Sequence, residues 1–126
     1  MALQTSNFKT YSMKINTFEE IIAWQKAKDL TIQIYSIFND SKDFGFRDQI
    51  QRASVSVMNN IAEGYETGTN RHFKHYLFTA KASCAEVRSM IILGFELGKL
   101  SKDQYDKLYS LSLEISRMIS GLIKTL

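Results

Sequence analysis

The sequence predicts an all-α protein, an antiparallel up-down-up-down four-helix bundle. Three observations lead to this fold class. The chain contains no proline, the residue that most strongly interrupts helices. Apolar residues recur at helical spacing in four long segments. Short polar or glycine-containing turns separate these segments, and short turns make successive helices antiparallel neighbours.

Length and composition limit the possible classes of protein. The 126 residues suit a single domain with one core. No apolar run approaches the roughly 20 residues of a membrane span, and the N-terminus lacks the apolar core of a signal peptide. The single cysteine, Cys84, suits a reducing compartment. We therefore expect a cytoplasmic protein without membrane contact, whose net charge of +3 is compatible with an anionic partner.

The first helix is expected to begin at Thr17, because Thr17 and Glu20 form a Thr-x-x-Glu capping box, and to end near Phe38. Residues 17–126 form the expected bundle. Residues 1–16 fall outside it and are interpreted as an N-terminal arm. This arm is either mobile or a short extended segment, the latter being indicated by the alternating residues Tyr11, Met13 and Ile15.

The second helix is expected from Phe44 to Ala62, with Gly64 and Gly68 as terminators. One apolar face consists of Phe46, Ile50, Ala53, Val57 and Ile61. A second consists of Val55, Met58, Ala62 and Tyr65. The polar stripe between them holds Asp48, Arg52, Ser56, Asn59 and Glu63. Two apolar faces indicate burial both in the bundle and against another subunit, whereas the alternative is a central helix with one solvated stripe.

The third helix is expected to begin after Thr69 or Asn70 and to end at Gly98, which can take the left-handed position after a helix. The fourth begins after Ser101, because Ser101 and Gln104 form a second capping box. The expected core positions of the third helix are Phe73, Leu77, Ala80, Cys84, Val87, Ile91 and Leu97. Those of the fourth are Tyr105, Leu108, Leu111, Ile115, Ile119 and Leu122.

The stretch QIQRASVSVMNNIAEG at residues 49–64 carries a family resemblance. It resembles the central motif of the four-helix-bundle proteins encoded in intervening sequences of bacterial large-subunit ribosomal RNA genes. The matching motif positions are Gln49, Arg52, Ala53, Ser56, Asn60, Ile61, Ala62, Glu63 and Gly64. Further matches are Trp24, Ala27 and Leu30 in the first helix and Phe73, Leu77, Ala80, Ser83 and Glu86 in the third. Two departures, Phe38-Asn39 for Phe-Pro and Ala82-Ser83 for Gly-Ser, affect only a loop and a packing contact.

The resemblance implies a homopentamer without an established activity. It also implies that the motif residues serve the fold or its assembly, above all Gln49, Arg52, Ser56, Asn60, Glu63 and Gly64. The related accessory proteins of diversity-generating retroelements bind a reverse transcriptase and nucleic acid. The partners implied for this chain are therefore further copies of itself, RNA or DNA, and a ribonucleoprotein or reverse-transcriptase-like protein.

The third helix carries a candidate nucleic-acid surface. Between residues 71 and 88, four residues are basic and only Glu86 is acidic. Three of the basic residues are spaced by seven and share a helix face, which can follow a phosphate backbone, and an aromatic ring on the same stripe can stack on a base. The candidate contacts are Arg71, Lys74, Phe78, Lys81 and Arg88. The alternatives are a solvated basic face, or pairing of these cations across a subunit boundary with Asp48, Glu63 or Glu66.

Signals for catalysis are weak, and we predict no enzyme, no cofactor and no metal. His72 and His75 have the spacing of a metal-binding pair but lack an evident third ligand. Glu63 and Glu86 could approach as an acid/base pair, although pairing with an arginine is the simpler interpretation. Cys84 has no evident activating base. The leading hypothesis is a nucleic-acid or ribonucleoprotein-binding adaptor, and the alternative is a structural or protein-interaction bundle with no nucleic-acid role.

Overall fold

The computed structural model describes residues 15–126, which form four α-helices preceded by one 3-10 turn. The turn η2 spans Phe18–Glu20. The helices are α1 Ile22–Phe38, α2 Phe44–Glu66, α3 Asn70–Glu96 and α4 Lys102–Thr125. The predicted all-α fold class is confirmed. Of the expected N-terminal arm, residues 1–14 lie outside the described residues, and with them Tyr11 and Met13.

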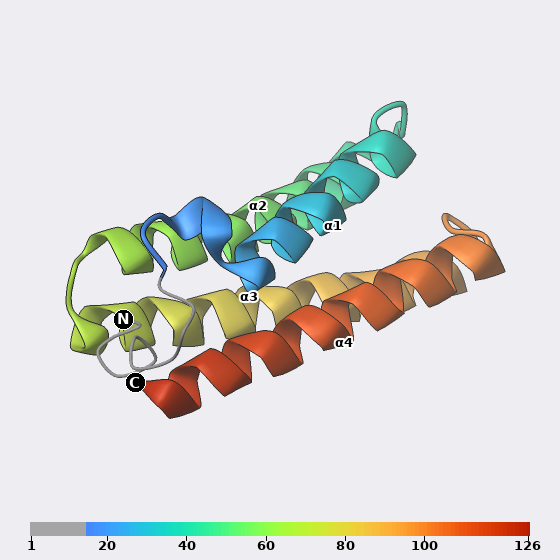
Figure 1. Ribbon diagram of the computed structural model, residues 1–126. Coiled ribbons are helices and arrows are strands. Elements are labelled where there is room, and N and C mark those ends of the chain that lie inside the picture. Colours follow the sequence, from blue (N-terminus) through green and yellow to red (C-terminus); the bar gives the residue numbers. More distant parts are fainter. Residues whose placement is uncertain (1–14) are drawn as a thin grey trace.

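The helices pack in chain order. Each helix packs against the next, and α1 also packs against α4, so α1 and α3 lie at opposite corners of the bundle. In Figure 1 the turns after α1 and after α3 lie at one end of the bundle, and the turn after α2 lies at the other. This alternation is the one expected for an up-down-up-down bundle. Within residues 15–126, none of the helices combines the length and apolarity needed to cross a membrane.

The start of α1 corrects the sequence prediction. Thr17 makes no capping hydrogen bond through its side chain, and Glu20 Oε1 instead accepts from the backbone N–H of Asn16 at 3.0 Å. The residues after Thr17 form the short turn η2, Ile21 is extended and only 2% exposed, and α1 begins at Ile22. Burial of Ile21 in the core therefore overrides the local capping pattern, because packing outweighs weak local preferences.

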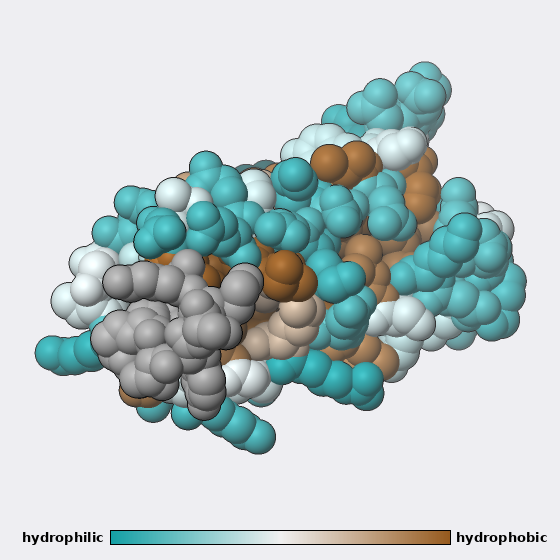
Figure 2. Space-filling model, viewed as in Figure 1, coloured by the Kyte–Doolittle hydropathy of each residue, from teal (hydrophilic) through white to brown (hydrophobic). Residues whose placement is uncertain are grey.

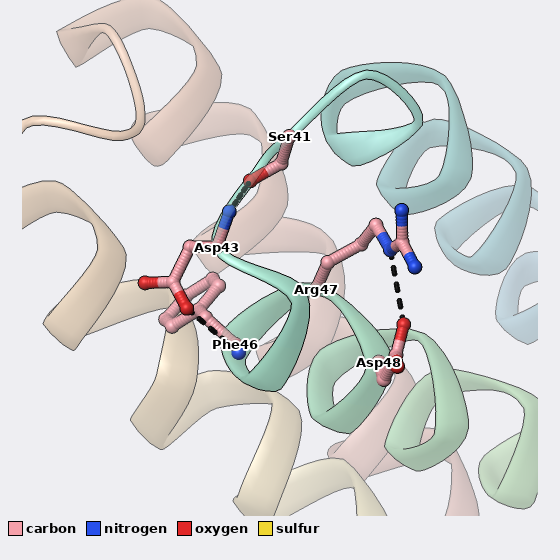
Figure 3. Close-up of polar contacts among 5 residues, drawn as sticks. All are labelled: Ser41, Asp43, Phe46, Arg47 and Asp48. Atoms are coloured by element: carbon pink, nitrogen blue, oxygen red, sulfur yellow. Dashed lines mark hydrogen bonds and ion pairs between the residues drawn. The ribbon is translucent and has the colours of Figure 1, made fainter.

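The start of α2 lies where the sequence predicts it. Asp43 caps the helix by accepting from the backbone N–H of Phe46 at 3.2 Å, as Figure 3 shows. Ser41 Oγ in turn accepts from the backbone N–H of Asp43 at 3.3 Å. Lys99, from the turn before α4, forms an ion pair with Asp43 at 2.9 Å. That ion pair and the bond from Phe46 hold the pKa of Asp43 below its usual value.

The end of α2 again differs from the prediction. The helix does not stop at Ala62 but continues to Glu66, so Gly64 lies inside it, and only Gly68 takes the left-handed conformation with φ +81°. A Cβ added to Gly64 would lie 2.5 Å from Cβ of Tyr76 and 3.1 Å from Cδ1 of Phe73. Gly64 is therefore a packing residue that lets α2 and α3 approach closely, and not a terminator.

The ends of α3 and α4 confirm the predicted caps. Thr69 accepts from the backbone N–H of His72 at 3.2 Å and begins α3. Gly98 follows α3 with φ +74°. Before α4, Ser101 Oγ accepts from the backbone N–H of Gln104 at 3.1 Å, and Gln104 Oε1 accepts from that of Ser101 at 2.9 Å, which completes the capping box.

One continuous core fills the space between the helices. Its largest fully buried side chains are Leu30, Ile34, Ile50, Val57, Ile61, Leu77, Ile91, Leu108, Ile115 and Ile119. The first apolar face of α2 is buried as predicted. Leu97, expected in the core, is 57% exposed because α3 ends before it. Thr31 Oγ1 donates to the carbonyl oxygens of Ala27 and Ser54, so this buried hydroxyl joins α1 to α2.

Candidate nucleic-acid interface

The polar residues of the helix-two motif form a seam between α2 and α3. Ser56 Oγ and Ser83 Oγ are hydrogen-bonded at 2.8 Å. Asn60 Nδ2 donates to the carbonyl oxygen of Ser56 at 2.8 Å and to its Oγ at 3.0 Å. Both Ser56 and Asn60 are half-buried. The serine hydroxyls and the amide thus satisfy one another beside the core, where the Ser56–Ser83 bond joins α2 to α3 and the bonds of Asn60 lie within α2.

Other motif residues divide into two groups. Gln49 Nε2 donates to Glu86 Oε2, so Gln49, like Gly64, contacts α3. Arg52 and Glu63 are exposed, and neither forms an ion pair within residues 15–126.

Glu63 and Glu86 lie far apart. Because Glu86 lies level with Gln49, it is separated from Glu63 by fourteen residues of helix, about 21 Å at 1.5 Å per residue. An acid/base pair of Glu63 and Glu86 is therefore excluded in the single chain.

The second apolar face of α2 serves mainly the chain itself. All four of its residues are half-buried, and Met58 and Tyr65 pack against the core. The hydroxyl of Tyr65 donates to the carbonyl oxygen of Ile15 at 2.7 Å, which ties the residues before α1 to α2. This face is consequently weaker evidence for a subunit contact than the sequence suggests, because the chain covers much of it.

The predicted basic stripe is present on the N-terminal half of α3. Arg71, Lys74 and Lys81 are exposed, and none forms an ion pair within residues 15–126. Phe78, between the two lysines, is 53% exposed. These four side chains are free to meet a ligand from solvent.

Arg88 departs from the predicted stripe. It is half-buried, and its Nη1 atom is shielded from solvent without a hydrogen-bond partner in the described part of the chain. The reason is geometric: residues spaced by seven drift about 20° per heptad around a straight helix, so the row of Lys74, Lys81 and Arg88 turns gradually away from solvent. Arg88 therefore belongs to a different environment from the two lysines.

Two further cations, both from α4, lie beside this stripe in the structure and are not predicted from the sequence. Cys84 Sγ lies 3.2 Å from the carbonyl oxygen of Ser112, and the rings of Phe95 and Tyr105 stack at 4.7 Å. This antiparallel register places Arg117 level with Lys81, and Lys124 level with Lys74. Arg117 and Lys124 are exposed and have no ion pair within residues 15–126.

The basic face, defined as Arg71, Lys74, Lys81, Arg117 and Lys124, contains much of the positive charge of the chain. Residues 70–85 and 115–126 hold five of the 16 basic residues and none of the 13 acidic ones. At the opposite end of α4, by contrast, Lys102 pairs with Asp106 at 2.7 Å and Lys107 with Asp103 at 3.3 Å. Charge is thus segregated along α3 and α4, although Glu20 and Glu66 lie at the same end of the bundle, near Tyr65. A count of charge by half-helix could have found the missing cations.

The residues weighed for catalysis do not gather into a site. His72 Nδ1 is hydrogen-bonded to Thr69 Oγ1 at 2.7 Å, and no group of three metal-ligating side chains occurs among residues 15–126. Cys84 is buried, and burial raises the pKa of its thiol to about 11, against a smaller opposing effect of the Arg88 charge. The thiol is therefore a core group that is protonated at neutral pH.

Fold and site together define an all-α four-helix bundle with a helix-packing motif in α2 and a basic face on α3 and α4. The chain belongs to the family of 23S rRNA-intervening sequence proteins, whose family model matches residues 19–121. This confirms the family resemblance of the helix-two motif.

The fold is also similar to a solved structure. A protein of unknown function from the S23 ribosomal protein family of Bacteroides thetaiotaomicron is 23% identical, with a TM-score of 0.76. The similarity covers 82% of this chain and 96% of that one. At this identity the likeness supports the fold alone. No curated protein matches the chain.

Proposed function

We propose that this protein is a homo-oligomeric, cytoplasmic adaptor that binds RNA or DNA through the basic face of α3 and α4. The observation that carries the proposal is the gathering of five cations within residues 70–85 and 115–126, ranges without an acid, on two helices that pack against each other. Phosphate groups are the ligand that such a surface suits best. An ordinary solvated helix face carries both signs of charge, as the opposite end of α4 does.

The chemistry of this surface is that of phosphate neutralisation. Lys74 and Lys81 are seven residues apart, about 10.5 Å along α3, and Arg117 and Lys124 have the same spacing on α4. The two rows can contact separate phosphates along a nucleic-acid backbone, and binding would release counterions and weaken with salt. Phe78 lies between the lysines, where its exposed ring can stack on an unpaired base. Such contacts favour nucleic acid of any sequence.

Self-association strengthens this proposal. The family resemblance implies five copies, and five chains of +3 each concentrate a moderate field around one particle. Nucleic acid that touches several basic faces at once gains affinity without any new kind of contact. A ribonucleoprotein or reverse-transcriptase-like protein is a further proposed partner, on the analogy of the retroelement accessory proteins.

The test is a gel shift at several salt concentrations, on structured RNA and on DNA. Changing Lys74 and Lys81 to Gln should weaken binding to every sequence and lower the salt slope by roughly two. Fold and oligomer mass should be unchanged, because both side chains are exposed. The matched control changes Lys102 and Lys107 to Gln, an equal loss of charge at the acid-paired end of α4, and should leave binding unchanged.

An alternative function is a structural or protein-interaction bundle without a nucleic-acid role. The observation that favours it is a set of large apolar side chains exposed on α3 and directly after it, namely Phe78, Ile92, Leu93 and Leu97. Absence of salt-dependent binding to any RNA or DNA, or equal loss in the two double variants, would support this alternative and reject the adaptor.

A further inference from the structure

We propose that the C-terminal half of the outer surface of α3 docks onto the outer surface of α1 in a second copy of this chain, where Arg88 meets Asp29. The inference rests on the proposed self-association and names the two surfaces that would mediate it. Its evidence is the exposure of apolar side chains, the unpaired guanidinium of Arg88 and the complementary charge on α1.

The α3 docking surface, defined as Ala82, Ala85, Ser89, Ile92 and Leu93, is open and largely apolar, and exposed Glu96 lies at its C-terminal edge. Ile92 and Leu93 are 43% and 46% exposed, although an exposed helix face usually carries polar side chains. Ala82, Ala85 and Ser89 are also exposed, and their spacing places them on the same side of the helix. Small residues in the middle of this surface allow another helix to approach closely, while the larger ones supply apolar area.

Arg88 borders this surface and lacks a partner. Its Nη1 atom is shielded from solvent and has no hydrogen bond within residues 15–126. An unpaired donor of a charged group is costly, and Arg88 as a whole is only half-buried, so its other guanidinium nitrogens can still meet a carboxylate from outside the chain. The planar guanidinium suits such a carboxylate. A partner that brings one acidic group among apolar side chains therefore fits this surface.

The outer surface of α1 has that composition. The α1 docking surface, defined as Ile22, Gln25, Asp29, Ile32 and Tyr35, is largely exposed, with Ile22, Ile32 and Tyr35 at 49%, 58% and 42%. Figure 2 shows apolar residues reaching the surface over α1. Asp29 lies among them and forms no ion pair in the described part of the chain. Lys28, the one cation on the same side of α1, lies with its ammonium over the Trp24 ring, 5.3 Å from the ring centroid. Asp29 can thus pair with Arg88 while the isoleucines contact the apolar side chains of α3.

Other acidic residues fit less well. Asp48 already lies 3.0 Å from Arg47, and Asp43, Asp103, Asp106 and Glu114 are paired with lysines. Glu63 and Glu66 lie near the end of α2, where no large apolar side chain is exposed on that helix; Phe44, its one such residue, lies at the start. Asp29 is the one acid within α1, and it combines a carboxylate that has no ion pair among residues 15–126 with exposed apolar neighbours.

The positions of the two surfaces determine the kind of assembly. Because α1 and α3 lie at opposite corners of the bundle, one chain can use both surfaces at once. Such head-to-tail contacts close into a ring or continue as a filament, unlike the paired contact of a twofold dimer. The arrangement fits a cyclic oligomer, and it leaves the basic face on the other half of α3 open.

A charge exchange tests this contact. Asp29→Arg should shift the mass measured by light scattering from oligomer to monomer, and so should Arg88→Glu. The chain carrying both changes should recover the oligomer, because the pair is restored with reversed polarity. Glu66→Arg is the matched control of charge reversal outside both surfaces and should keep the wild-type mass. Circular dichroism will show whether Arg88→Glu still folds. If it does not, Ile32→Glu and Ile92→Glu test the same contact with Arg88 unchanged, and each should also give a monomer.

The outcomes separate this inference from the proposed function. A monomeric wild-type protein would overturn self-association and the docking surfaces together. A wild-type oligomer that persists in Asp29→Arg, Ile32→Glu and Ile92→Glu would overturn only the docking surfaces. An Arg88→Glu protein that folds, keeps the oligomer mass and loses nucleic-acid binding would assign Arg88 to phosphate contact and overturn its pairing with Asp29.

Discussion

Gly64 determines how closely α2 and α3 can pack. Replacing it with alanine places a Cβ 2.5 Å from Cβ of Tyr76, an atom fixed to the backbone that cannot swing away. We expect Gly64→Ala to lower the free energy of unfolding by about 1–3 kcal/mol, the usual cost of overpacking, in urea melts. Gly121→Ala is the control, because open space surrounds Gly121 within α4 and alanine should there add about 0.5–1 kcal/mol. Equal effects at both glycines would refute the packing role.

Asn60 tests the polar seam at the same scale. Its side-chain amide donates to the carbonyl oxygen and to Oγ of Ser56. Asn60→Leu removes both hydrogen bonds and places an apolar side chain beside these two oxygens. We expect a loss of about 1 kcal/mol in thermal or urea unfolding. Asn59 is the control, because it is the exposed neighbour, and Asn59→Leu should change stability little. A wild-type melt for Asn60→Leu would mean that the seam contributes nothing to stability.

Helix ends show where sequence is sufficient and where packing decides. The caps of α3 and α4 could be predicted because their hydrogen bonds join residues three apart, such as Thr69 with His72 and Ser101 with Gln104. The start of α1 could not, because Ile21 is drawn into a core made by distant residues. The sequence predicts Gly64 as a terminator for the same reason, because its close contact with Tyr76 depends on how α3 is placed, and no local pattern shows this.

The start of α2 gives a pH-dependent prediction. The pKa of Asp43 is lowered by Lys99 and by the backbone N–H of Phe46, so its carboxylate stabilises the fold above the unfolded-state pKa, and this contribution is lost as pH falls through the lowered value. Asp43→Ala should therefore melt at a lower temperature than wild type at neutral pH, and the two melting curves should converge in acid. Asp40→Ala, in the same turn, should follow wild type throughout. A difference that persists at acidic pH would exclude the charged cap as its cause.

Across the whole molecule, charge and apolar surface divide α3 into two halves. The exposure of Lys74 and Lys81 could be predicted from their positions off the apolar repeat. That Arg117 and Lys124 lie level with them could not be predicted, because only the register between α3 and α4 sets the relative height of these cations. The burial of Arg88 follows from helical drift that a strict sevenfold spacing hides. The N-terminal half of α3 thus suits phosphate, and its C-terminal half suits another chain.

This division leads to a prediction that couples assembly to nucleic-acid binding. Asp29→Arg adds positive charge, which by itself would strengthen attraction to phosphate. If the docking surfaces hold the oligomer together, the same change should nevertheless weaken binding, because each freed chain presents one basic face instead of several. We expect at least a tenfold loss of affinity, roughly 1.4 kcal/mol, and a smaller salt slope in gel shifts on structured RNA. The variant with both Asp29→Arg and Arg88→Glu should regain the wild-type mass, affinity and slope together. Affinity that rises in Asp29→Arg while the mass falls to that of a monomer would show that single chains bind nucleic acid without help from assembly.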